Sequence, residues 1–229
     1  MVKSYYLDFL QVFENALARI KQCPVCSAIC FENIFLCDTC ERQLQNFAVQ
    51  KNISDYGFKV KSLYLWNSQN SYLIRPLALG LKNGGRSEVF KFLATRLLAL
   101  SHNDHIETKK PICFVPTPSR TGGQVLDHAG LLAYWLAKLS GAEFCPALKN
   151  LSESAQKTKN RLERRELKIS LNSEIQWLKS LTHKVILVDD VITTGATARA
   201  SYIALEQPAQ FEVWTLFVVS SCWRERHLV

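Results

Sequence analysis

The chain has 229 residues, of which 48% are hydrophobic, and a formal net charge of +8 at pH 7. This length suffices for one α/β core with a small appendage, and no apolar run approaches the roughly 18 residues that a membrane-spanning helix needs. This net positive charge favours polyanionic partners, either nucleic acid or phosphorylated small molecules. Asp8 and Glu14 interrupt the apolar N-terminal stretch, which therefore predicts an amphipathic helix in a cytoplasmic protein and not a secretory signal.

Four of the eight cysteines form two Cys-x-x-Cys pairs, which are Cys23, Cys26, Cys37 and Cys40. Thiolates at this spacing can close a tetrahedron around Zn²⁺ with no open position, which predicts a structural zinc knuckle. Chance cysteines or a redox pair are alternatives, and Cys30, a fifth thiol inside the knuckle, could replace one ligand. We therefore divide the chain into an N-terminal helix with a zinc knuckle, residues 1–55, and a larger domain, residues 56–229.

The first part of the larger domain carries strand and helix signals in turn. The polar stretch 45–57 before it predicts a linker or loop. A strand is expected over 58–66 and a helix over 72–81, which ends at the stop signal Lys82-Asn83-Gly84-Gly85. Apolar residues at helical spacing predict another helix over 87–100, and the polar tract 101–110 predicts an exposed loop.

A first candidate ligand loop follows the strand expected over 112–115. An apolar strand that ends in a turn with prolines and glycines places a loop at the carboxyl edge of a parallel sheet. Thr117, Ser119, Arg120 and the loop amides could hold a phosphate group there. The alternative is that Pro-x-Pro is only a rigid exit from the strand.

The middle and the end of the domain give weaker signals. A helix is expected over 126–139, a strand over 144–148, and a strand over 211–219 at or near a sheet edge. Residues 149–168 are strongly basic and contain a predicted helix over 161–167. A mobile basic loop in this segment could close over a ligand and exclude water, and a solvated helix face is the alternative.

The most informative stretch runs from Lys184 to Thr197. Its aliphatic start, rich in β-branched residues, is typical of a strand buried on both faces of a parallel sheet. Asp189 and Asp190 follow, then a loop of threonines and Gly195, then a helix-forming segment. The start of a helix suits a phosphate, and the acids suit sugar hydroxyls or hydrated Mg²⁺. The pattern predicts a ribose 5-phosphate site; the alternative is a helix cap beside a solvated acid.

This stretch resembles the phosphoribosyl pyrophosphate (PRPP) signature of type I phosphoribosyltransferases. The resemblance implies a parallel sheet flanked by helices, with Mg²⁺ bridging the diphosphate and the ribose. It implies that Asp189 and Asp190 are the catalytic acids and contact the ribose hydroxyls. It also implies that the loop wraps the 5′-phosphate with the residues Val191, Thr193, Thr194, Gly195, Ala196 and Thr197.

Together with the cysteine pairs, the chain resembles the ComF family, whose members join a four-cysteine zinc element to a type I phosphoribosyltransferase-like domain. The shared segments are the four cysteines, Leu81-Lys82, Gly84-Gly85, Val115 to Pro118, Gln156, Arg161 to Arg165 and Val188 to Thr197. One segment departs: Gln124-Val125-Leu126-Asp127-His128 stands where the family usually carries Arg-Gly-Phe-Asn-Gln. The arginine is missing, and His128 could be a donor to the diphosphate or a surface or capping residue.

Members of this family are linked to natural transformation, where they handle single-stranded DNA after its entry into the cytoplasm. The resemblance therefore implies a PRPP-binding competence protein, with single-stranded DNA and other DNA-uptake or helicase proteins as partners. Base stacking is compatible with Trp66, Trp135, Trp177 and Tyr72, although such residues are more often core. The alternatives are a PRPP-dependent phosphoribosyltransferase of nucleotide or base metabolism, whose acceptor the sequence does not name, and a zinc-stabilised adaptor without a working pocket. Whether the chain is an enzyme is left open.

Overall fold

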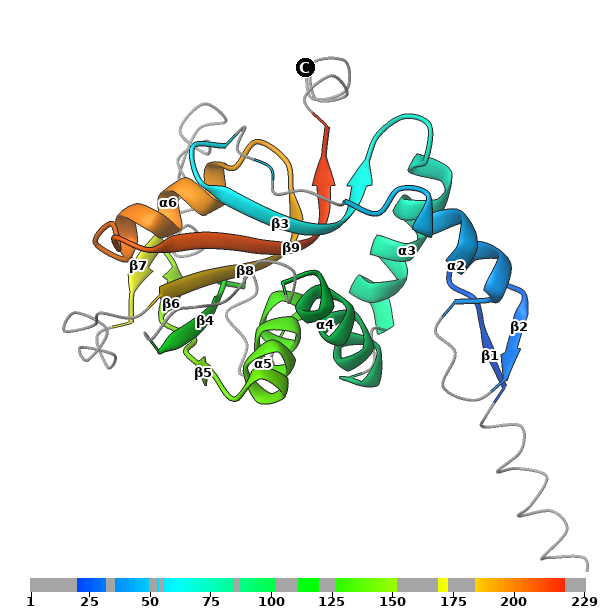
Figure 1. Cartoon of the computed structure of the whole chain (residues 1–229), viewed down its shortest axis with the longest axis horizontal. Helices are drawn as coiled ribbons and strands as arrows, with labels where there is room; N and C mark the ends of the chain where they lie inside the picture. Colours follow the sequence, from blue (N-terminus) through cyan, green and yellow to red (C-terminus); the bar gives the residue numbers. More distant parts are fainter. Residues whose placement is uncertain are drawn as a thin grey trace, which may run out of the picture.

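The computed structural model describes residues 20–31, 36–49, 53, 56–84, 87–101, 111–119, 127–151, 169–172 and 184–220. Its centre is a five-stranded sheet in the order β3-β9-β8-β4-β5, in which all neighbouring strands are parallel (Figure 1). The strands are β3 (Lys59–Trp66), β4 (Ile112–Pro116), β5 (Glu143–Phe144), β8 (Lys184–Ile192) and β9 (Phe211–Val219). With helices on its faces, this sheet confirms the predicted α/β fold class.

The central strands are buried on both faces, as the aliphatic sequence of β8 predicts. Along β8, Val185 and Leu187 pack in one hydrophobic cluster, and Ile186 and Val188 pack in another, because successive side chains point to opposite faces. The first cluster includes α6 (Ala196–Ala204). The second includes α3 (Ser71–Gly84), α4 (Ser87–Ser101) and α5 (His128–Ser140), and Figure 1 shows α4 and α5 across the sheet from α6.

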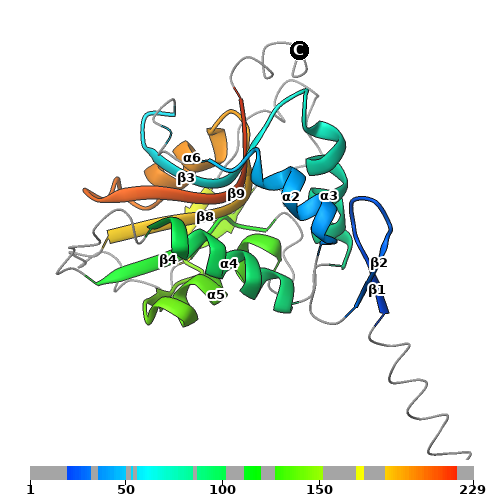
Figure 2. The same cartoon turned by 45° about the vertical axis from the view of Figure 1, so that its right-hand side comes forward.

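The cysteine element lies beside α3 (Figure 2). An antiparallel hairpin of β1 (Ile20–Gln22) and β2 (Ile29–Phe31) is followed by α2 (Asp38–Gln45). The buried side chains Leu36 and Leu44 of this element belong to the same hydrophobic cluster as α3 and α4. The division of the chain near residue 55 stays a prediction.

Most predicted elements are confirmed with small shifts at their ends, but the strand predicted over 144–148 is wrong. Pro146 separates two strands there, because proline has no N–H group to continue a ladder. The first strand, β5, stays in the main sheet. The second, β6 (Leu148–Asn150), pairs antiparallel with β7 (Ile169–Leu171), which sequence patterns did not predict. The strand predicted at or near an edge, β9, lies one strand inside it.

In the stretch 45–57, predicted as a linker or loop, the described residues 47–49 and 53 lie along the outer edge of β3. The N–H of Val49 donates to the carbonyl of Leu63 at 3.0 Å. Ile53 and Val60 exchange two backbone hydrogen bonds of 3.0 and 2.9 Å. An edge strand otherwise exposes unpaired N–H and C=O groups, so these contacts protect the sheet.

Some predictions lie outside the described residues. These are the N-terminal helix up to residue 19, most of the loop at 101–110, Arg120, the segment 152–168 with its helix, and Trp177. Within the described part of the chain, every helix is too short or too polar to span a membrane.

Candidate functional site

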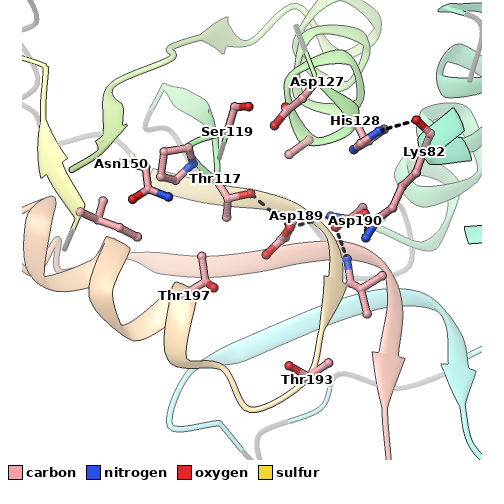
Figure 3. Close-up of a pocket in the computed structure, with 14 residues that line it drawn as sticks. Lys82, Thr117, Ser119, Asp127, His128, Asn150, Asp189, Asp190, Thr193 and Thr197 are labelled. Atoms are coloured by element: carbon pink, nitrogen blue, oxygen red, sulfur yellow. Dashed lines mark hydrogen bonds and ion pairs between the residues drawn. The ribbon is translucent and has the colours of Figure 1, made fainter. Parts of the chain in front are cut away.

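A cavity of about 470 Å³ opens at the carboxyl ends of β8 and β4, the edge at which open parallel sheets bind ligands (Figure 3). Its walls come from α3, the residues after β4, α5, the β6–β7 pair, and the loop between β8 and α6. The lining residues are Lys82, Thr117, Pro118, Ser119, Asp127, His128, Ala129, Asn150, Ile169, Asp189, Asp190, Val191, Thr193 and Thr197. Segments far apart in the sequence therefore bring both predicted ligand loops to one cavity.

Two neighbouring strands fix the acid pair of Asp189 and Asp190. The N–H of Thr117 donates to the carbonyl of Val188 at 2.8 Å, which extends the pairing of β4 with β8 to the residue before the acids. The Thr117 hydroxyl donates to Asp189 Oδ1 at 3.1 Å, and the N–H of Asp190 donates to the same oxygen at 2.9 Å. The N–H of Val191 donates to Asp190 Oδ1 at 2.9 Å. Both carboxylates are therefore held at the cavity wall (Figure 3).

Burial raises the pKa of Asp189 well above its ordinary value of 3.8, and the charge of Asp190 beside it raises this pKa further. Two carboxylates in one partly dry site repel each other, and a cation between them would favour the ionised form of both. The acid pair therefore favours a cation ligand.

The raised pKa of Asp189 predicts that the acid pair lowers the free energy of unfolding, by an amount that depends on pH. Above about pH 4 the unfolded chain releases this proton first, so the free energy of unfolding falls as pH rises toward the folded-state pKa. Asp189→Asn removes this cost and keeps an oxygen to accept from Thr117. We expect the variant to be more stable by about 1–2 kcal/mol at pH 7 and no more stable at pH 3.5. Urea denaturation of both proteins across this pH range measures the difference; a constant difference would contradict the prediction.

Lys82, in the last turn of α3, supplies a cation to the acid pair. Its Nζ lies 3.3 Å from Asp190 Oδ2. Its carbonyl accepts a hydrogen bond of 3.3 Å from His128 Nε2, so Nε2 carries the proton in this arrangement. From the sequence alone Lys82 belongs to a helix stop signal and to a shared family segment. Only the fold brings it to Asp190.

Asp127 and His128 have different positions at the start of α5. Asp127 is the N-cap, and its carboxylate accepts from the N–H of Gly130 at 2.9 Å. His128 is the first helical residue, lines the cavity, and has its ring 6.5 Å from that of Phe90. His128 is therefore not the cap, and its contact with a diphosphate stays a prediction.

The loop after β8 has the backbone conformation that its glycine predicts. Gly195 has a φ of 72° and is the N-cap of α6. Among the described residues, no acceptor is found for the N–H of Thr197 or of Ala198. The start of α6 therefore offers donors and a partial positive charge beside the cavity, as an anion site requires.

The predicted phosphate contacts divide into three groups. Thr117, Ser119, Val191, Thr193 and Thr197 line the cavity together with the acid pair. Thr194, Gly195 and Ala196 are not among the lining residues, and the Thr194 hydroxyl instead accepts from the N–H of Ala196 at 3.3 Å. Arg120 lies outside the described residues. The ligand roles of all of them stay predictions.

The four predicted metal ligands also meet. The sulfur atoms of Cys23, Cys26, Cys37 and Cys40 all lie within 4.8 Å of one another, and the sulfurs of Cys26 and Cys37 are 3.5 Å apart. Cys30 is not part of this group, because its thiol donates to the Ala28 carbonyl at 3.6 Å. The group could hold a metal ion with four thiolates.

The thiols of this group do not ionise equally. Burial acts to raise the pKa of Cys23, but the N–H groups of Cys37, Cys26 and Val25 lower it to about 7. Burial and the neighbouring thiols raise the pKa of Cys40. Four thiolates so close together need a cation between them, and a bound metal deprotonates its thiols.

Comparison with known proteins gives only a distant likeness, to a solved structure. No protein-family model and no curated protein matches the chain. Among solved structures, the chain is similar to an adenine phosphoribosyltransferase, with 17% sequence identity and a TM-score of 0.39. The match covers 63% of this chain and 77% of that one. Because this likeness is so distant, the ligand class has to be inferred from the residues that line the cavity.

Proposed function

We propose that the cavity binds PRPP with Mg²⁺ and that the protein is a cytoplasmic, phosphoribosyltransferase-like member of the ComF family. The observation that carries this proposal is the meeting of the acid pair and the start of α6 in one cavity of about 470 Å³. A ribose 5-phosphate carries a diol and a phosphate at opposite ends, which suit these two features. The volume is that of a small-molecule site.

Each wall of the cavity has a role in this proposal. The free N–H groups of Thr197 and Ala198 and the hydroxyl of Thr197 hold the 5′-phosphate. Asp189 and Asp190 accept from the ribose hydroxyls and ligate Mg²⁺, which supplies positive charge toward the diphosphate. Ser119 lies on the β4 side, where the diphosphate is expected.

Zn²⁺ is the ion that we propose for the cysteine group. Zn–S bonds of about 2.3 Å in a tetrahedron place the sulfurs about 3.8 Å apart, near the 3.5 Å between Cys26 and Cys37. With four protein ligands the ion has no open position, so its role is structural.

Calorimetry with three ligands tests the cavity. PRPP with Mg²⁺ is expected to bind more tightly than ribose 5-phosphate or diphosphate alone, because it fills both ends of the site. Chelation of Mg²⁺ should weaken PRPP binding, since two acids then face an anionic ligand. No heat with PRPP and Mg²⁺ would reject the proposal.

We also propose that the protein handles imported single-stranded DNA in natural transformation. The family resemblance and the net charge of +8 support this role. Tyr72 on α3 is 64% exposed and lies one turn from the exposed Arg75, an arrangement that suits base stacking and a phosphate contact. Trp66 and Trp135 are half-buried, and their indole N–H groups donate to the hydroxyls of Ser71 and Ser87.

Fluorescence titration with a labelled oligothymidylate at several salt concentrations tests the DNA role. Affinity should fall with salt, and Tyr72→Ala should weaken it at every salt concentration without changing the salt dependence. A response that is flat with salt would reject phosphate contacts. Leu79→Ala, which removes an exposed apolar side chain of the same helix, is the matched control.

The alternative is a PRPP-dependent phosphoribosyltransferase of nucleotide or base metabolism. The same acid pair and cavity support it, because a transferase needs them to orient the ribose and neutralise the leaving diphosphate. Diphosphate release in the presence of purine or pyrimidine bases would favour this alternative over the DNA role.

A further inference from the structure

The ring of Tyr56 lies directly behind the loop that precedes α6. A Cβ atom at Gly195 would come within 2.8 Å of Tyr56 Cδ1. Tyr56 is 4% exposed and belongs to the hydrophobic cluster that contains Ile192 and Ala198, which flank the loop. It is not a lining residue of the cavity. The ring therefore supports the loop from behind and leaves the ligand side open.

Tyr56 is itself fixed by its surroundings. Its hydroxyl donates to the carbonyl of Val219, at the end of β9, at 3.1 Å. On one side along the chain, Ile53 is bound to Val60 of β3 by two backbone hydrogen bonds. On the other side, Gly57 has a φ of 82°, which lets the chain turn into β3. The ring thus connects the loop to β9, while the backbone near Tyr56 is held against β3.

We propose that Tyr56 is a positioning residue that holds the loop 193–197 in its phosphate-binding conformation before the ligand arrives. This inference rests on the proposed function of the cavity. Glycine can leave the left-handed region at little cost, and a loop that must be ordered on binding loses affinity through entropy. The Tyr56 ring occupies the space next to Gly195, so the N–H groups at the start of α6 stay in place.

A positioning role and a merely structural role predict different results. If Tyr56 only stabilises the fold, its loss weakens all ligands of the cavity alike. If it positions the loop, its loss weakens ligands that carry a 5′-phosphate and spares diphosphate, which is expected on the β4 side of the cavity.

The experiment compares Tyr56→Leu with Tyr64→Leu. Tyr64 is a matched control because it is also buried, with 2% exposure, but it packs in the other hydrophobic cluster, where its ring stacks on Phe217 at 6.0 Å. Calorimetry measures the affinity for ribose 5-phosphate and for diphosphate with Mg²⁺. Hydrogen exchange in the free protein measures the protection of the amides of Ala196 and Arg199, which donate to Thr194 and Gly195 of the loop.

For Tyr56→Leu we expect roughly tenfold weaker binding of ribose 5-phosphate, diphosphate binding within about twofold, and faster exchange in the loop. Tyr64→Leu should leave the ratio of the two affinities and the loop exchange unchanged. Equal losses for both ligands, or unchanged loop exchange in Tyr56→Leu, would overturn the inference.

Two further results keep the test decisive. If the wild-type protein binds no ribose 5-phosphate, the proposed function fails, while loop exchange still decides whether Tyr56 holds the loop. If Tyr56→Leu does not fold, Tyr56→Met replaces it with the same expected outcomes, because methionine fills more of the space with a flexible chain.

Discussion

Replacing both acids, Asp189→Asn with Asp190→Asn, is expected to lower the affinity for PRPP with Mg²⁺ by about 100-fold or more, since each charge-assisted hydrogen bond contributes about 1.5–3 kcal/mol. The fold should survive. Each asparagine keeps an oxygen that can accept from Thr117 or from the N–H of Val191, and Lys82, whose side chain is 47% exposed, can turn to solvent. Calorimetry gives the affinity, and circular dichroism with urea denaturation gives the fold.

Asp127→Asn is the matched control for this double variant. It is the same chemical change in a residue that lines the same cavity, but Asp127 caps α5 and its replacement can still accept from Gly130. We expect affinity within about threefold of the wild-type value, since asparagine caps a helix as well as aspartate. An unfolded double variant would show that the acids are structural. An unchanged affinity would place PRPP elsewhere.

Loss of binding combined with a gain of stability would be informative in itself. The raised pKa of Asp189 means that the acid pair costs folding free energy at neutral pH. Structural carboxylates are normally paired and lower their pKa, as Glu212 does through the ammonium of Lys184 at 2.8 Å despite its burial. Two carboxylates that repel each other at a cavity wall are typical of a ligand site, where stability is given up for binding.

The central strand and the cysteine group could be predicted from the sequence because their signals are local. The aliphatic run of β8, the two acids and the glycine turn follow one another along the chain, and the parallel sheet carries them to one edge. The spacing of Cys23, Cys26, Cys37 and Cys40 similarly requires only a hairpin and the start of a helix to bring the sulfurs together.

The remaining parts of the site depend on contacts between distant segments. Lys82 reaches the site because α3 ends beside Asp190, and Tyr56 supports Gly195 because its ring packs on that glycine from a segment 139 residues earlier in the chain. Neither residue has a sequence pattern that indicates its partner. The strand predicted over 144–148 is wrong for a local reason, because Pro146 interrupts the ladder among the apolar residues around it.

Loss of the zinc ion that we propose for the cysteine group is expected to destabilise the whole protein, not the knuckle alone. Cys23 and Cys40 are 1% and 4% exposed and belong to the same hydrophobic cluster as α3 and α4. The turn of the knuckle also packs tightly on α3, since a Cβ at Gly80 would lie 2.9 Å from Pro24 Cβ. Cys40→Ser should therefore abolish zinc binding and lower stability by about 3 kcal/mol or more, or roughly 6–12 °C in Tm.

Cys30→Ser is the control for Cys40→Ser, because Cys30 is an equally buried thiol of the same element outside the four-sulfur group. It should keep one zinc ion per chain by elemental analysis and lose much less stability. PRPP affinity gives a second measurement. Helix α3 packs on the knuckle at Gly80 and reaches Asp190 through Lys82, so it links the cysteine group to the cavity. Loosening this helix should also weaken PRPP binding. Zinc retained in Cys40→Ser would remove Cys40 from the ligand set, and an unchanged Tm after zinc loss would show that the knuckle does not support the fold.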